Sequence, residues 1–193
     1  MRASWALRLV AFAAVLAVAG CTTHRKEEVT YHDPGMDFSL LQKVAVLPFV
    51  NLTQNPSAGE RVRDVFSTML QAAGTIYVLP PGEVARGLDR AAVAKPTTPT
   101  AEECVNLGKI LQVDAVITGV VREYGGVRSG TAASNVASVS VQLMETQSGK
   151  VVWSASSTQG GISAADRMFG GGGDPMDQVT SEAVRDLLDK LFK

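Results

Sequence analysis

The chain has 193 residues, of which 18 are Lys or Arg and 19 are Asp or Glu, so its formal net charge at pH 7 is −1. A chain of this length can bury a substantial core as one domain. The Lys and Arg residues do not cluster, which excludes the strongly basic surface that is typical of nucleic-acid-binding proteins.

Residues 1–20 have the order of a secretory signal peptide: Arg2 and Arg8, then an uncharged apolar run, then small residues before Cys21. The apolar run is shorter than the ~20 residues that a membrane-spanning helix needs. The stretch Val18-Ala19-Gly20-Cys21 looks like the bacterial lipobox, in which the Cys receives fatty-acyl chains such as palmitate and becomes the first residue of the mature protein. The alternative is an ordinary signal peptide with a chance Cys after the cleavage site.

Residues 21–36 are polar and contain a Pro-Gly turn signal near their end, so we interpret them as the lipidated N-terminus and a flexible tether. The domain is then expected at 37–193. Fifteen tether residues at ~3.4 Å each span at most ~50 Å, which keeps the domain close to its membrane. Both His residues, His24 and His32, fall in the tether without clustered ligands, so we expect no metal site.

Three apolar runs, each separated from the next by helical patterns, are expected to be strands, at 44–50, 76–79 and 115–121. Amphipathic helices are expected between them, at 57–73, 83–92 and 100–111. Two pairs have capping-box spacing at helix starts, Ser57 with Glu60 and Thr100 with Glu103. Right-handed crossovers place the three strands in one sheet.

The pattern changes after these elements. Residues 124–130 predict a loop, and 138–143 with 151–158 predict an antiparallel hairpin. The Gly-rich stretch 159–173 is irregular, and Asp174 as cap with Pro175 at the first helical position predicts a C-terminal amphipathic helix. The expected fold class is therefore α/β: a single three-layer domain with a mixed sheet of about five strands plus a C-terminal helix.

Three segments in this order behind the lipobox resemble bacterial envelope lipoproteins of the curli-secretion CsgG and LpoB type: Val44–Asn51, Val113–Tyr124 and Glu145–Ser154. The resemblance spans roughly residues 43–192. It implies a TolB N-terminal-like α/β domain that is anchored to the outer membrane and faces the periplasm. One branch of the family forms a secretion pore by extending two hairpins into the membrane, and the other activates a bifunctional penicillin-binding protein.

The sequence departs from both branches. Membrane-spanning strands need ~9–11 residues with alternating apolar positions, whereas 124–135 is rich in Gly, Ser and Arg and 159–174 is rich in Gly. The tether is also shorter than the long one that the synthase-activator branch uses. The identity of a partner therefore does not follow from the resemblance.

The sequence contains no recognisable catalytic set. With both His residues in the tether, no Ser has a plausible base beside it, and the Gly-rich stretches lack the Gly-Lys-Ser/Thr ending of a phosphate-binding loop. We expect no enzymatic activity and no cofactor. If Cys21 carries lipid, Cys104 has no partner within the chain; its apolar neighbours favour burial over a disulfide between chains.

The expected function is that of a non-enzymatic accessory or regulatory binding module of an envelope machine. By family, that machine is peptidoglycan synthesis, with a penicillin-binding protein as partner; the alternatives are an oligomeric curli-type secretion channel component and a small-ligand-binding protein. Outer-membrane anchoring rests on Thr22, because the family's sorting rule retains proteins with Asp there at the inner membrane. We hypothesise that the loops 124–130 and 160–173 form the recognition surface, although the apolar residues of the second loop could instead pin it to the core. The candidate contact residues are Tyr124, Arg128, Arg167, Met168 and Phe169.

Overall fold

The computed structural model describes residues 30–130, 132–162 and 173–193. The signal peptide, Cys21 and His24 precede this range, and Arg167, Met168 and Phe169 fall in the gap before residue 173. The predictions that concern them lie outside the described residues.

The described residues build one mixed sheet of seven strands in the order β1-β7-β6-β5-β2-β4, with β3 beside β5. β2 pairs in parallel with β4 and β5, whereas β5, β6, β7 and β1 form an antiparallel series. The predicted mixed sheet is confirmed, and β1 and β3 are additional to the five strands expected. The strands are β1 Thr30–His32, β2 Lys43–Val46, β3 Val50–Asn51, β4 Tyr77–Val78, β5 Ala115–Ser129, β6 Ala132–Glu145 and β7 Val151–Gly160.

Helices cover the two faces of the sheet unequally. The helices α2 (Ala58–Ala72) and α6 (Met176–Leu191) pack on one face, which we call the back face, and α3 (Pro81–Arg90) and α4 (Ala101–Leu111) pack on the other. Side chains alternate between the two faces along each strand. Val44 and Ile117 therefore lie in the back core, whereas Ala45 and Val116 lie in the core under α3 and α4. This arrangement is the three-layer α/β class that the sequence predicts.

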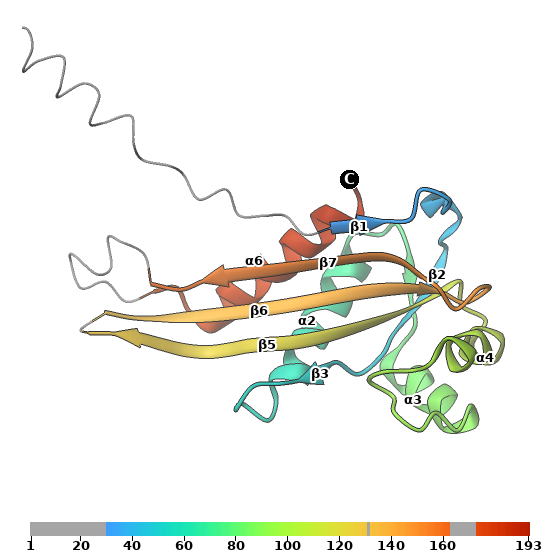
Figure 1. Cartoon of the computed structure of the whole chain (residues 1–193), viewed down its shortest axis with the longest axis horizontal. Helices are drawn as coiled ribbons and strands as arrows, with labels where there is room; N and C mark the ends of the chain where they lie inside the picture. The colour runs from blue at the N-terminus through green and yellow to red at the C-terminus, as the bar shows by residue number, and fades with distance from the viewer. Residues whose placement is uncertain (1–29, 131, 163–172) are drawn as a thin grey trace, which may run out of the picture.

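The third layer covers only part of the sheet. Figure 1 shows α2 and α6 behind the long strands β5, β6 and β7, while α3 and α4 lie at the end where β2 sits. Within the described residues, no helix lies over the other half of this face, which we call the open face. The amphipathic period of β6 explains the difference, because Val139 and Val141 are buried on the back face and alternate with polar residues, Ser140 and Gln142.

The predicted loop at 124–130 is wrong, because this stretch continues β5. The β5–β6 ladder runs from the Ala115–Glu145 pair to the Ser129–Ala132 pair, with one irregularity between Val121 and Glu123. Gly, Ser and Arg have low intrinsic strand preference, so local sequence favours a loop here. The preference is weak and context decides it: β6 supplies a partner along the whole length.

The segment expected to be tether also contributes to the sheet. β1 pairs antiparallel with β7, from Thr30 opposite Ala155 to His32 opposite Trp153. The indole Nε1 of Trp153 donates to the carbonyl oxygen of Lys190 at 3.3 Å, and His32 Nε2 lies 3.1 Å from the same oxygen. His32 therefore belongs to an edge strand, and its ring contacts the C-terminal end of α6.

Of three predicted helix caps, one is confirmed. Thr100 and Glu103 form the reciprocal capping box of α4, with Thr100 Oγ1 accepting from the Glu103 amide at 3.2 Å and Glu103 Oε2 accepting from the Thr100 amide at 2.7 Å. Ser57 makes no such bond, because its hydroxyl lies 3.0 Å from Asn55 Oδ1. Asp174 is displaced because α6 begins one residue later, with Pro175 as its N-cap.

Candidate protein-binding surface

The open face carries a shallow depression with a mixed polar and apolar lining, next to the loop that precedes α4. Its cavity volume is about 250 Å³, and the loop of Thr97, Thr98 and Pro99 forms one wall. Arg122 and Gln142 border it and are exposed. The strand residues that line it are Thr118, Gly119, Val120, Arg122, Ser140, Gln142, Met144 and Val151.

Ser140 gives this depression an unmet hydrogen-bonding requirement. Its Oγ is buried and has no hydrogen-bond partner among the described residues. A buried hydroxyl without a partner costs roughly 1–3 kcal/mol. The neighbouring pair Ser138 and Thr158, by contrast, satisfy each other across the strands at 2.9 Å. A group that reached Ser140 from outside would recover part of this cost.

The structure brings Tyr124 and Arg128 onto one face of β5, on opposite sides of Gly126. Tyr124 is half-buried against the back core and α6, and its hydroxyl lies 3.5 Å from Thr180 Oγ1. Arg128 is exposed near the end of the β5–β6 hairpin and forms no ion pair with any described residue. Of the two, Tyr124 therefore has a packing role within the domain, and Arg128 is available to a partner.

A second depression lies along β5 where β3 ends. It has a volume of about 350 Å³, and we call it the β5 groove. Leu52 and Val127, which are 65% and 36% exposed, give it an apolar lining. The other lining residues are Thr53, Gln54, Arg122, Glu123, Tyr124, Gly125, Gly126 and Val136. Sequence reasoning missed this groove because it depends on the strand register of a stretch that looks like a loop.

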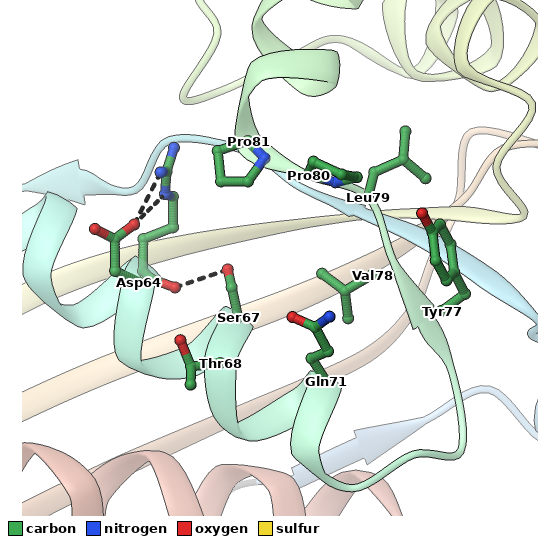
Figure 2. A pocket seen from close by; sticks show the side chains of 10 residues that line it. Asp64, Ser67, Thr68, Gln71, Tyr77, Val78, Leu79, Pro80 and Pro81 are labelled. Carbon is green, nitrogen blue, oxygen red and sulfur yellow. Dashed lines mark hydrogen bonds and ion pairs between the residues drawn. The ribbon is translucent and has the colours of Figure 1, made fainter.

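A larger cavity of about 650 Å³ lies between α2 and the β4–α3 connection (Figure 2). Its charged residues, Arg63 and Asp64, neutralise each other, with Arg63 Nη2 and Nε donating to Asp64 Oδ1 at 2.9 and 3.2 Å. Ser67 donates to the Arg63 carbonyl oxygen at 2.8 Å. The remaining lining is neutral and includes Gln71, Tyr77 and Pro80. The cavity is therefore large, but its lining does not bring reactive groups together.

Cys104, which the sequence places in the core, is buried on α4. Its Sγ lies 3.7 Å from the carbonyl oxygen of Glu145. Burial, together with the charge of Glu145, raises the pKa of the Cys104 thiol to about 11. Since the thiolate is the reactive form, this thiol is a poor nucleophile at neutral pH.

In residues 30–130, 132–162 and 173–193, no three His, Cys, Asp or Glu side chains lie in position to hold a metal ion together. No helix in the same ranges combines the length and the apolar character needed to cross a membrane.

Comparison with known proteins identifies the fold. No family model matches the chain, and no curated protein matches it. Among solved structures, the PelC dodecamer from Paraburkholderia phytofirmans has a TM-score of 0.56 at 18% identity, covering 85% of this chain and 95% of that one. Lipoprotein GNA1162 from Neisseria meningitidis has a TM-score of 0.54 at 16% identity, covering 78% and 98%.

The LpoB C-terminal domain from Escherichia coli matches less closely, with a TM-score of 0.49 at 13% identity, covering 65% of this chain and 87% of that one. That likeness is too loose to support an argument, and the likenesses to PelC and GNA1162 concern the fold alone. The chain therefore shares the α/β fold of PelC and of lipoprotein GNA1162.

Proposed function

We propose that the protein is a non-enzymatic envelope lipoprotein whose domain serves as an accessory or regulatory binding module. Its machine would be peptidoglycan synthesis, with a penicillin-binding protein as partner. In this proposal the lipid on Cys21 holds the domain at the periplasmic side of the outer membrane. The lipobox supports the anchor, and the fold shared with a solved lipoprotein agrees with it.

The observation that carries the proposal is the uncovered half of the sheet. The exposed Arg122 and Gln142 can form hydrogen bonds over this surface. So can its small hydroxyl side chains, among them Ser140, whose hydroxyl has no partner in the described part of the chain. A rigid polar face that must satisfy buried groups on contact suits specific protein recognition. The same face offers no paired acid and base for catalysis among the described residues.

The anchor would hold this face close to the membrane. Because β1 begins at Thr30, only the residues between Cys21 and Thr30 link the lipid to the sheet. At ~3.4 Å per residue this link spans at most roughly 30 Å. The partner would therefore have to reach the outer membrane itself, rather than be reached by a long tether.

In-cell photocrosslinking from the open face tests the proposal. A photoreactive residue replaces Gln142 on β6, and the matched control replaces Arg185, which is also exposed but lies on α6 over the back face. We expect position 142 alone to capture a peptidoglycan synthase whose activity increases when the purified lipoprotein is added. Equal capture from both positions, or a captured synthase that does not respond, would contradict the proposal.

The oligomeric state of a structural neighbour favours a second candidate, an oligomeric secretion channel component. PelC, which shares the fold, is a dodecamer. The inner half of the β5–β6 hairpin belongs to the core of the domain, with Ile117 and Val141 buried there, so only its outer half could enter a membrane. Ion conductance by detergent-extracted protein in planar bilayers would support this candidate. We would expect a variant with a shortened hairpin to lose this conductance. If the wild-type protein at high density conducts no ions, this candidate is excluded.

A further inference from the structure

Among the described residues, no strand pairs with the outer half of β5 on the side away from β6. β3 covers β5 only as far as Val121, whose carbonyl oxygen accepts from the Leu52 amide at 2.9 Å. On β6, the carbonyl oxygens of Ala133 and Asn135 accept from Gly173 and Gly161, so these residues face away from β5. In an antiparallel ladder, the opposite residues then face away from β6. These residues on β5 are Arg128, Gly126 and, by alternation, Tyr124.

The other described edges of the sheet are short or partly covered. On β7, β1 covers Trp153 to Ala155, and the buried Lys190 ammonium donates to the Ser156 carbonyl oxygen at 3.0 Å. β4 has only two residues. Natural sheets protect edges with short strands, Pro, Lys or covering segments. The stretch from Glu123 to Arg128 has its charged residues and its bulge at the two ends, and its centre, Tyr124 to Val127, contains no charge and no Pro and is Gly-rich.

We infer that this edge pairs antiparallel with the same edge of a second copy of the chain, with Gly126 opposite Gly126. The inference goes beyond the proposed function, since the edge of β5 lies outside the open face that would bind the synthase. In this register Tyr124 lies opposite Arg128 of the second copy, and the reverse. The three residues whose amides face outward then meet in hydrogen-bonded pairs.

The side chains of the edge are self-complementary in this register. An Arg guanidinium opposite a Tyr ring is a favourable cation–π arrangement, and Arg128 forms no ion pair with any described residue of its own chain. Each Arg128 lies opposite Tyr124 of the other copy, so the two Arg128 residues are offset by four positions, roughly 14 Å, along the strands. Their like charges therefore do not meet.

Val127 and Gly125 are complementary on the other side of the ladder. The register places Val127 opposite Gly125 of the second copy. Gly125 has no side chain, and an ideal Cβ there would meet no atom within 4 Å. Val127 can therefore lean into the β5 groove, between Leu52 and Val136. Both copies fill each other's groove, as a two-fold interface requires.

The length of the free edge also fixes the register. The loop after β3 lies at one end of the stretch and the hairpin turn at Gly130 lies at the other. Two copies that slide by two residues lose a hydrogen-bonded pair and leave Tyr124 without Arg128. A second copy fits the edge through these matched features, whereas an unrelated peptide would have to reproduce them.

Disulfide trapping of the full-length protein in membranes tests this contact. Gly126→Cys is suited to it, because a Cβ at Gly126 has only two atoms near 4 Å, Asn135 Oδ1 and the Ser134 carbonyl oxygen. Opposite residues in a hydrogen-bonded pair have Cα atoms ~5.5 Å apart, within the ~4.4–6.8 Å that a disulfide spans. Arg128→Cys and the exposed Lys109→Cys on α4 are the controls, and wild type gives the background from Cys21 and Cys104.

After mild oxidation we expect at least tenfold more covalent dimer from Gly126→Cys than from either control. Adding Val127→Lys to Gly126→Cys should reduce the yield at least fivefold, and adding Leu40→Lys, at an exposed site elsewhere, should leave it unchanged. Equal yields from the three Cys positions would overturn the inference. So would a Gly126→Cys variant whose new thiol traps the chain's own N-terminal residues or a different protein. Crosslinking from Gln142 does not depend on this edge, so the two proposals fail separately.

Discussion

Replacing Gly119 by Ala is expected to destabilise the domain, because another residue already occupies the place of its side chain. An ideal Cβ at Gly119 lies 2.7 Å from Cδ2 and Cε2 of Phe49. Phe49 is buried, and its ring centroid lies 6.0 Å from that of Phe66, so it has little room to withdraw. Overpacking of this kind costs about 1–3 kcal/mol.

The matched control is Gly126→Ala, on the same strand. Its Cβ would meet nothing closer than 3.9 Å, and its φ is not positive. Replacing a Gly by Ala where the backbone permits it stabilises by about 0.4–1 kcal/mol through the unfolded chain. Gly119→Ala gains the same stabilisation through the unfolded chain, which offsets part of the overpacking. Its net loss in the free energy of unfolding should therefore be roughly 1–2 kcal/mol, which corresponds to a decrease in Tm of about 2–8 °C.

Urea denaturation followed by circular dichroism measures both variants, with an unchanged slope as the check on two-state behaviour. A Gly119→Ala variant as stable as Gly126→Ala would refute the packing argument. Adding Phe49→Leu to Gly119→Ala should cost less than the sum of the single changes, because the smaller side chain relieves the contact.

Three further predictions concern the anchor, the caps and the buried thiol. Cys21→Ser should move the protein from the membrane to the soluble fraction, and a variant that still sediments with membranes would contradict the lipid anchor. Thr100→Ala should lower the free energy of unfolding by about 1 kcal/mol, whereas Ser57→Ala, which removes no capping bond, should change it by less than half as much in the same urea titration. Because the pKa of Cys104 is raised to about 11, folding favours its protonated form, so Cys104 should leave stability unchanged below pH ~9 and lower it from there to pH ~11. Native-state alkylation of Cys104 should be slow at pH 8, and a rate equal to that of a free thiol would contradict the burial.

The sequence predicted the parts of the fold in which local pattern and packing agree. The stripe Val62, Phe66 and Leu70 of α2 is buried as expected, and Thr100 caps α4 as its spacing indicates. Ser57 has the same spacing with Glu60, but Asn55 competes for its hydroxyl, and spacing alone does not reveal a competing neighbour.

The parts that could not be predicted depend on contacts distant in sequence. Thr30–His32 is too short to show a strand pattern, although Thr and Tyr favour strands. It becomes a strand because it pairs with the edge of β7 and because His32 contacts the Lys190 carbonyl oxygen near the end of α6. The candidate binding surface that we propose depends on the tertiary structure, and the sequence-based choice of contact residues stays a prediction. Tyr124 and Arg128 were named for their side chains, whereas the open face and the unpaired Ser140 depend on which half of the sheet the helices leave uncovered.

The glycines of β5 have different physical explanations, and the difference bears on what the hairpin does. At Gly119 the missing side chain makes room for Phe49 of the same chain, and at Gly125 a φ of +146° is a backbone conformation that residues with a side chain rarely adopt, so the domain itself explains both residues. At Gly126 the φ is not positive, and no described side chain comes closer than 3.9 Å to the position of a Cβ. Glycine weakens a strand and often marks a place where another backbone approaches closely, and at Gly126 nothing within the described part of one copy offsets that cost. A second strand laid against this edge would offset it, because the absence of side chains is what lets Val127 of the incoming strand reach Leu52 and Val136.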